Sequence, residues 1–324
     1  LDPATRRVFV GLMLGMLVAS ISQTIVSPAM PIIVAELGGI EHYSWLATAA
    51  MLASAVVVPV VGKLSDLYGR RGFYLGALAT FLVGALLSGL AQSFWWLVGA
   101  RVVQGLGMGA LMALSQTVIG DIIPPRQRGK YQGIMGAVFG LTSIAGPLVG
   151  GFVTDHWGWR WLFFVGIPFG LVGLVFIVKN LHLPHTPRKA VVDVWGILTL
   201  TVALVAILLA VSWGGTTYPW GDWHVLGLFG LGAVALVAFV LIERKAVEPV
   251  IPLRLFKNPT FTASNIASLA VAMGMFGAIF YIPVYAQGVL KANATSSGAI
   301  VMPMSLSMIV LSMVIGVLIT RTGK

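Results

Sequence analysis

Residues 62–71 read G-K-L-S-D-L-Y-G-R-R, and this short polar and basic segment lies between two long apolar runs. The runs cover residues 44–64 and 73–92. Each has about the 20 apolar residues that a helix needs to cross a membrane. Gly62 and Gly69 would permit a tight turn between the runs, because glycine adopts backbone conformations that are closed to other residues. The stretch therefore predicts two transmembrane helices joined by a basic turn.

The composition of the whole chain indicates a membrane protein. Of its 324 residues, 58% are hydrophobic and 9% are charged, whereas soluble proteins average about 45–50% and about 25%. This balance excludes a water-soluble globular domain. The net charge of +10 would suit nucleic acid, but the basic residues lie in short loops, as in membrane proteins that face an anionic cytoplasmic leaflet. The absence of cysteine excludes disulfides, thiol chemistry and cysteine-ligated metals.

Ten apolar runs are long enough to cross the bilayer, so we predict an all-α polytopic membrane protein. The runs are continuous and not alternating, which disfavours strands. The first run begins near Val8, is too long for a signal sequence and lacks a cleavage site, so we expect it to remain as the first spanning helix. The runs cover residues 8–33, 44–64, 73–92, 95–120, 130–154, 160–180, 193–213, 224–242, 260–288 and 297–319.

The distribution of basic residues predicts the orientation. With a cytoplasmic N-terminus, 17 of the 20 basic residues fall in inside segments, whereas Arg160 and Lys291 fall outside and Arg101 lies within a span. An excess of basic residues in cytoplasmic loops is the positive-inside rule. We therefore expect a multi-pass protein of the cell inner (plasma) membrane, with the N-terminus and the 184–192 linker cytoplasmic.

Tryptophan residues provide an independent indication of the outer surface. Tryptophan is enriched where a membrane meets water, because its ring is apolar and its N–H is polar. Nine tryptophans fall near the predicted outer surface, where we expect an interfacial belt: Trp45, Trp95, Trp96, Trp157, Trp159, Trp161, Trp213, Trp220 and Trp223.

A second copy of the basic segment closes the sequence. Residues 316–324 read G-V-L-I-T-R-T-G-K, and four positions match the first copy at a constant offset of 254. A repeated helix-end motif implies two related bundles. We expect a six-helix N-terminal bundle over 1–183, a cytoplasmic linker plus two additional transmembrane helices over 184–258, and the first part of a C-terminal bundle over 259–324. Four more helices would complete the second bundle, so we expect a truncated chain.

Three motifs together resemble the major facilitator superfamily. Residues 62–71 are similar to its signature G-x-L-x-D-R-x-G-R-R, with Leu67 in the place of a basic residue. Residues 101–109, R-V-V-Q-G-L-G-M-G, are similar to its second motif. Residues 145–151, A-G-P-L-V-G-G, look like the antiporter motif of its drug exporters, although Thr142 stands where glycine is usual.

Two further segments resemble the fourteen-helix drug:proton antiporter family (multidrug efflux type) within that superfamily. They are W-R-W-L-F-F-V-G-I-P at 159–168, and Y-I-P-V-Y-A-Q-G-V-L at 281–290 followed by Pro303. The resemblance implies the major facilitator fold, with a six-helix N-terminal bundle, two extra linking helices and a partial second bundle, truncated after about ten helices. It also implies secondary active export of hydrophobic drugs or other amphipathic compounds by alternating access, in exchange for protons.

The first apolar run departs from that family at one position. Residues 21–31 read I-S-Q-T-I-V-S-P-A-M-P, and Ser22 takes the place of a membrane-buried aspartate in the similar pattern L-D-x-T-V-V-N-V-A-L-P. A buried carboxylate can carry protons because desolvation raises its pKa, and serine cannot. We place none of the ten acidic residues in the middle of the membrane. The departure therefore argues against proton coupling through this position.

The basic turn is a candidate conformational switch. Asp66 can pair with Arg70 or Arg71, and such a cluster can bridge two bundles in one transport state and release them in the other. The alternative is a basic loop that only sets the topology. The candidate switch residues are Gly62, Asp66, Gly69, Arg70 and Arg71.

Arg101 is the one charge that we place inside a span. An arginine at a helix centre costs about 2.5–3.5 kcal/mol on insertion scales, so it normally faces a cavity or a partner. It also lies less than two turns from the outer surface, where it could snorkel into water. Gln104 shares its helix face. We take Ser22, Arg101 and Gln104 as candidates for proton or substrate gating.

The candidate antiporter-motif residues are Gly146, Pro147, Gly150 and Gly151. Pro147 removes a backbone hydrogen bond and kinks its helix, and the glycines allow close approach of a neighbouring helix. The resemblance implies a role in closing the outward side, and helix packing alone is the alternative.

We expect a substrate pocket between the bundles, near the middle of the membrane. Methionine and aromatic side chains suit adaptable recognition, although any one candidate could instead pack between helices. The candidate lining residues are Gln23, Thr24, Ser27, Met112, Gln116, Tyr281 and Tyr285.

An alternative function is the export of a specific endogenous product such as a lipid, siderophore or peptide, with little or no proton coupling through the first helix. A membrane-bound enzyme or sensor is disfavoured, because we recognise no nucleophile–base pair, metal cluster or phosphate loop in the sequence. We therefore expect no enzyme activity, cofactor or metal. The expected partners are the lipid bilayer, small hydrophobic or amphipathic substrates and protons, with no nucleic acid, and we expect a monomer.

Overall fold

The computed structural model describes residues 3–42, 44–181 and 192–289, together with isolated helical positions between 303 and 318. These parts of the chain form helices and no β-strand, so the predicted all-α fold class is confirmed. Eight helical segments among them are long and apolar enough to cross a membrane. The elements in chain order are α1 (Pro3–Thr24), η1 (Ser27–Ala29), α2 (Met30–Leu37), η2 (Ile40–His42), α3 (Trp45–Tyr68), α4 (Arg70–Gly89), α5 (Phe94–Ile122), α6 (Pro125–Trp157), α7 (Arg160–Asn180), α8 (Val194–Trp213), α9 (Trp223–Glu243), η3 (Leu253–Lys257) and α10 (Pro259–Gly288).

The first predicted span, residues 8–33, is broken in its C-terminal third. The backbone N–H of Ile25 still bonds to the carbonyl of Ile21 at 2.8 Å, but the next bond is a short-range one from Ala29 to Val26 at 3.0 Å. Pro28 causes the break, because proline has no N–H to donate to the preceding turn. Residues 184–191 of the predicted linker, most of the tenth predicted run (297–319) and most of the second motif copy lie outside the described residues.

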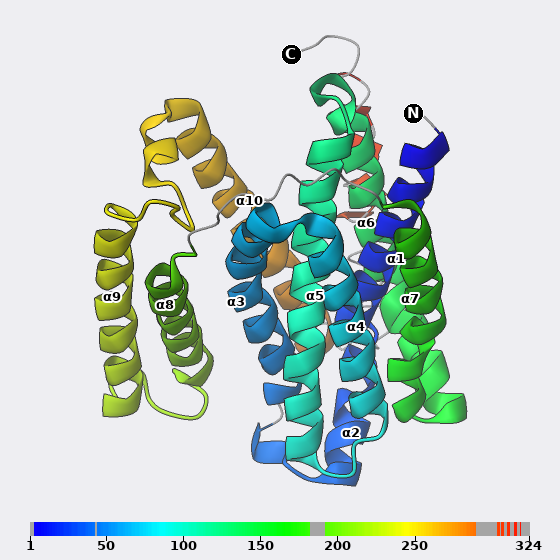
Figure 1. Ribbon diagram of the computed structural model, residues 1–324. Coiled ribbons are helices and arrows are strands. Elements are labelled where there is room, and N and C mark those ends of the chain that lie inside the picture. The colour runs from blue at the N-terminus through cyan, green and yellow to red at the C-terminus, as the bar shows by residue number, and fades with distance from the viewer. Residues whose placement is uncertain are drawn as a thin grey trace. The chain divides into compact units, whose positions relative to one another are not determined.

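The chain divides into two compact units that are described separately. Unit 1 contains Leu1–Pro125 and Ala145–Ile251, and unit 2 contains Arg126–Ile144 and Pro252–Lys324. Within unit 1, α5 packs along both α3 and α4, α1 packs along α7, and α8 pairs with α9 while its side contacts α3 (Figure 1).

Glycines explain why α5 approaches its two neighbours so closely. A side chain at Gly105 would collide with the backbone of Ala50 on α3, and one at Gly107 would collide with the backbone of Phe81 on α4. In the same contact between α4 and α5, a side chain at Gly84 of α4 would collide with the backbone of Gln104. Small residues let membrane helices pack backbone to backbone, so the glycine-rich motif of α5 builds the centre of unit 1.

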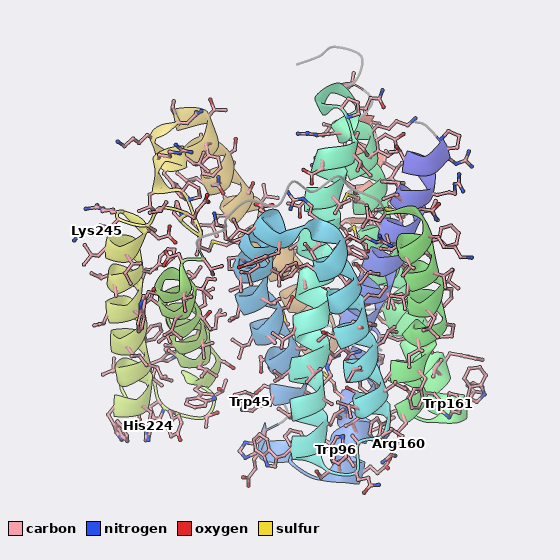
Figure 2. The ribbon with its side chains drawn as sticks, viewed as in Figure 1. Trp45, Trp96, Arg160, Trp161, His224 and Lys245 are labelled. Atoms are coloured by element: carbon pink, nitrogen blue, oxygen red, sulfur yellow. The ribbon has the colours of Figure 1, made fainter. Side chains whose placement is uncertain are left out.

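The two ends of unit 1 differ in chemistry. Figure 2 shows Trp45, Trp96 and Trp161 at one end, which we call the tryptophan end, and Lys245 at the other. We call the other end, where Gly69 joins α3 to α4, the motif end. Six of the predicted belt tryptophans are well exposed, namely Trp95, Trp96, Trp157, Trp161, Trp220 and Trp223. The belt assignment of Trp159 is wrong, because its side chain is buried against α2.

Unit 2 contains a sharp elbow between η3 and α10. The side chain of Asn258 caps α10, accepting hydrogen bonds from the N–H groups of Thr260 (3.0 Å) and Phe261 (3.4 Å). The Thr262 hydroxyl donates to the carbonyl of Phe256 at 2.7 Å, and the Phe256 and Phe261 rings meet edge to face. Capping of this kind satisfies N–H groups that a helix start leaves without partners.

Candidate functional site

A chain of buried polar side chains links three helices of unit 1. The guanidinium of Arg101 donates to the side-chain oxygen of Gln104 at 2.8 Å, and the Gln104 amide donates to the Ser22 hydroxyl at 2.9 Å. Arg101 also donates from Nε to the carbonyl of Leu46 on α3 at 3.3 Å. The exposed fractions are 3% for Arg101, 1% for Gln104 and 6% for Ser22. The structure therefore brings the three predicted gating candidates together across α1 and α5.

Arg101 is held inside the bundle and does not reach the outer surface. Its guanidinium lies 5.9 Å from the centre of the Phe163 ring on α7, in addition to its hydrogen bonds. The alternative in which this side chain snorkels into water is therefore wrong. Among the described residues Arg101 has no carboxylate partner. Its charge is instead stabilised by the neutral oxygens of Gln104 and Leu46. Buried charges normally require pairing or dense hydrogen bonding.

The break in the first span carries three of the predicted lining residues. Gln23 and Thr24 are half-buried and Ser27 is exposed. The Thr24 hydroxyl donates to the carbonyls of Ser20 (3.4 Å) and Ile21 (3.3 Å). Transporters often use discontinuous helices at substrate sites, where unwound backbone offers polar groups. The local structure is thus suited to contact a substrate.

Two glycines of the antiporter motif fit against this break. A side chain at Gly146 would collide with the Thr24 hydroxyl, and one at Gly150 would collide with the carbonyl of Ile25. Gly151 lies beside open space, and Pro147 is exposed in the helix interior. The motif therefore has one face that packs closely on the broken segment of α1 and another that does not.

The remaining lining candidates lie on two different units. Met112 is half-buried and Gln116 is exposed, and both lie on α5. Tyr285 is exposed on α10 in unit 2, and the side chain of Tyr281 is outside the described residues. Gln23, Thr24 and Ser27 therefore lie together at the break, whereas the contribution of Met112, Gln116 and the two tyrosines of α10 to the same pocket remains a prediction.

The basic turn at the motif end is a network centred on Arg70. Arg70 pairs with Asp66 at 2.6 Å and with Asp121 at the end of α5. Arg71 donates to the carbonyl of Val178 near the end of α7 at 2.8 Å. Basic groups stabilise the C-terminal ends of helices, where carbonyls lack partners. The turn thus ties together four helices of unit 1.

The predicted role of Gly62 in the turn is wrong. Gly69 alone connects α3 to α4 and has φ of 99°, a conformation that L side chains rarely adopt. Gly62 lies inside α3, and no neighbour contacts the position of its missing side chain. Its carbonyl accepts a hydrogen bond from the Ser65 hydroxyl at 2.9 Å. The turn therefore needs only one glycine.

A second polar cluster, which the sequence analysis did not identify, lies at the tryptophan end. Glu36 of α2 accepts hydrogen bonds from the Trp159 indole (2.7 Å) and from Arg160 (2.6 Å). Arg160 also donates to the carbonyl of Ala91 at 3.2 Å, and its guanidinium lies 4.3 Å from the centre of the Trp159 ring. The cluster joins α2, the start of α7 and the loop after α4. Only the acid–base character of these residues could have indicated it, because 124 residues separate Glu36 from Arg160.

Comparison with known proteins agrees with this architecture. The family model described as Major Facilitator Superfamily matches residues 12–324. The multidrug transporter protein MdtP of Bacillus subtilis (strain 168) is 41% identical over 313 residues, which are 97% of this chain and 58% of that protein. Multidrug resistance protein 3 of the same organism is 39% identical over 99% of this chain and 62% of its own length. The chain therefore spans less than two thirds of these relatives.

A solved structure shows the same fold at low sequence identity. The crystal structure of the human organic anion transporter MFSD10 (TETRAN) matches with a TM-score of 0.59 at 20% identity. The match covers 97% of this chain and 73% of the MFSD10 chain. At this level of identity the match is evidence for fold alone.

Proposed function

The chain belongs to the major facilitator superfamily, and from this premise we propose that it forms part of a secondary active transporter that exports hydrophobic or amphipathic compounds by alternating access. The observation that carries the proposal is the 41% identity to a multidrug transporter over 97% of the chain. A single bundle cannot alternate access alone, because the mechanism requires one half to rock against another. The proposal therefore concerns the native gene product as a whole.

The broken first span supports a binding role for unit 1. Gln23, Thr24 and Ser27 surround the break and are not fully buried. Methionine at position 112 adds an adaptable apolar surface, which suits chemically varied ligands. We propose that these side chains contribute one wall of the substrate pocket, and that Tyr281 and Tyr285 contribute to another.

Coupling of transport to protons is a separate part of the proposal. Export in exchange for protons requires a group that binds and releases protons along the pathway. Ser22 cannot do so, and this observation favours the alternative of an exporter with little or no coupling through the first helix. We propose that Arg101 and Gln104 gate this region electrostatically, with the proton carrier at another position.

A transport assay tests the proposed function. The native gene product would be reconstituted in sealed proteoliposomes, and movement of a fluorescent lipophilic cation would be followed with and without an imposed pH gradient. We expect gradient-driven movement that an unlabelled lipophilic drug inhibits. Movement driven without a pH gradient would favour the uncoupled alternative, and the absence of movement for every drug tested would contradict multidrug export.

Orientation and assembly complete the proposal. We propose that the motif end of unit 1 faces the cytoplasm of the cell inner membrane, since basic residues concentrate in the segments assigned to that side. We also propose a monomer with a six-helix N-terminal bundle over 1–183, two linking helices over 184–258 and a second bundle beginning at 259.

A further inference from the structure

Two acidic side chains meet at the motif end of the α8–α9 pair. Asp193 caps α8, where one of its oxygens accepts a hydrogen bond from the N–H of Gly196 at 2.8 Å. Glu243 ends α9, and one of its oxygens accepts a hydrogen bond from the N–H of Val250 at 2.9 Å. In each carboxyl group the second oxygen is buried and has no hydrogen-bond partner among the described residues.

The two carboxyl groups share one small space. A side chain at Gly196 would collide with Oδ2 of Asp193 and would lie 3.1 Å from Oε1 of Glu243. Glu243 is 5% exposed, so water does not screen its charge. Gly196 therefore provides the room in which the two acids approach each other.

Two carboxylates that lie this close cannot both ionise at low cost. Like charges at a shared site raise the affinity of one group for a proton, and burial acts in the same direction. A proton on one acid also creates a donor, which can satisfy an acceptor oxygen of the other. We propose that Glu243 binds a proton beside Asp193, and that this protonated carboxyl pair fastens α8 to α9 and to the segment after α9.

The surrounding charges are compatible with one proton on the pair. Lys63 of α3 lies within electrostatic range of Glu243 but is bonded to Glu248 at 2.9 Å, and its side chain is 14% exposed. Arg244 and Lys245 line an open groove together with Asp193. The groove opens beside Asp193 and does not reach Glu243, and Lys63 connects Glu243 to the α3 segment that carries the basic motif.

A bound proton explains the cluster better than a bound metal ion. Calcium takes six to eight oxygen ligands, and magnesium requires near-octahedral coordination. The described residues contain no group of three or more acidic or histidine side chains arranged to hold a metal. Two carboxyl groups with one unpaired oxygen each are too few ligands for these ions but are enough to bind a proton.

Protonation makes the α8–α9 contact sensitive to pH. Loss of the proton places two negative charges between the first turn of α8 and the last turn of α9, so this end of the helix pair should loosen as pH rises. The inference goes beyond the proposed function, because it holds whether or not transport is coupled to protons. It therefore requires readouts other than transport.

Infrared difference spectroscopy of the native gene product in lipid nanodiscs tests the pair directly. On raising the pH, we expect loss of a protonated carboxyl C=O band that shifts in D₂O, and Glu243→Gln should abolish this change. Asp155→Asn is the matched control, because it removes an exposed carboxylate near the end of α6 and leaves Lys63 bonded to Glu248, so the band should remain. A band that persists in Glu243→Gln, or that disappears in Asp155→Asn, would overturn the proposal.

Amide hydrogen exchange provides a second readout if a variant folds poorly. Exchange in residues 241–251 should accelerate several-fold on raising the pH of the wild-type protein, beyond the intrinsic base catalysis seen in a denatured control. Asp193→Asn keeps a good helix cap and should remove that extra acceleration. The same acceleration in Asp193→Asn, or its reversal by calcium or magnesium, would contradict a proton site.

Discussion

The side-chain amide of Gln104 donates a hydrogen bond of 2.9 Å to the hydroxyl of Ser22, and the same Gln104 accepts one of 2.8 Å from Arg101. Ser22 therefore ends a buried polar chain that begins at a positive charge. An acid at position 22 would be separated from the guanidinium of Arg101 only by the side chain of Gln104. The geometry thus suits a carboxylate at this position, although the chain has serine there.

The first prediction concerns this position. Ser22→Asp should increase pH-driven export, because it introduces a buried carboxylate that can bind and release a proton beside Arg101. Export of a fluorescent substrate from proteoliposomes would be measured as a function of the imposed pH gradient. Ser22→Asn is the matched control, since it has nearly the same size but cannot carry a proton. Unchanged pH dependence in Ser22→Asp, or an equal increase in Ser22→Asn, would contradict the prediction.

The second prediction uses two neighbouring glycines of α6. Gly150→Ala places a methyl group against the carbonyl of Ile25 and near Pro28, whereas Gly151→Ala places it in open space. Overpacking of this kind costs about 1–3 kcal/mol, so Gly150→Ala should lower the melting temperature and the transport rate. Gly151→Ala should leave both near wild type. Equal behaviour of the two variants in a thermal-shift assay would show that the close contact of α6 with α1 is unimportant.

How well the sequence predicts the fold depends on how far apart in the sequence the interacting residues lie. Apolar runs identify spans because burial in lipid depends on local composition. The Arg101–Gln104 pair was also predictable, because residues three apart share a helix face. The break near Pro28 could have been predicted from the missing N–H of proline.

Interactions between distant segments could not be predicted in the same way. Arg70 has carboxylates within reach at Asp66, four residues earlier, and at Asp121, and only the packing of α5 beside the turn reveals the second. The pairs Lys63–Glu248 and Arg160–Glu36 depend likewise on tertiary packing. Gly62 was misjudged because sequence does not distinguish a glycine inside a helix from one with a positive φ.

The third prediction concerns the charge network of the basic turn. Asp66→Asn should leave the melting temperature nearly unchanged, because its half-exposed carboxylate forms a surface-type pair worth at most about 1 kcal/mol. Transport should nevertheless fall, if the network switches between states as the family resemblance implies. The change would be measured as initial rates at matched protein levels.

Asp155→Asn is the control for that experiment. Asp155 is exposed, lies near the end of α6 and has no salt bridge among the described residues. Its substitution should leave both stability and transport unaltered. Wild-type rates in a well-expressed Asp66→Asn protein would refute the switch and leave a topology-setting loop.

The fourth prediction concerns pH and the start of α9. Asp222 caps this helix and accepts hydrogen bonds from the backbone N–H of His224 at 2.8 Å and from its ring at 2.6 Å. These bonds hold the pKa of Asp222 below its ordinary value. A lowered pKa means that the cap is complete above the ordinary aspartate pKa and is lost as pH falls through the lowered value.

Amide exchange at the first turn of α9 measures this dependence. In the wild-type protein, protection at residues 224–226 should decrease as pH falls below the ordinary range for aspartate, after correction for intrinsic exchange. Asp222→Asn should remove the acid-side decrease, because asparagine caps helices without titrating. An acid-side decrease of the same size in Asp222→Asn would assign the effect to another group.

The last prediction tests the proposed orientation in the membrane. The chain contains no cysteine, so single cysteines introduced at Ser93 and at Gln127 can be labelled without background. Ser93 is exposed in the loop between α4 and α5, and Gln127 is exposed near the start of α6. α5 alone separates the two positions and is 29 residues long, which exceeds the length of about 20 residues that crosses the hydrocarbon core. The two positions should therefore react with an impermeant maleimide from opposite sides. In intact cells, Ser93→Cys should be labelled and Gln127→Cys should react only after permeabilisation, since the positive-inside rule places the basic segment at residues 126–130 in the cytoplasm. Labelling of both from one side would refute the topology, and the reverse pattern would refute the orientation alone.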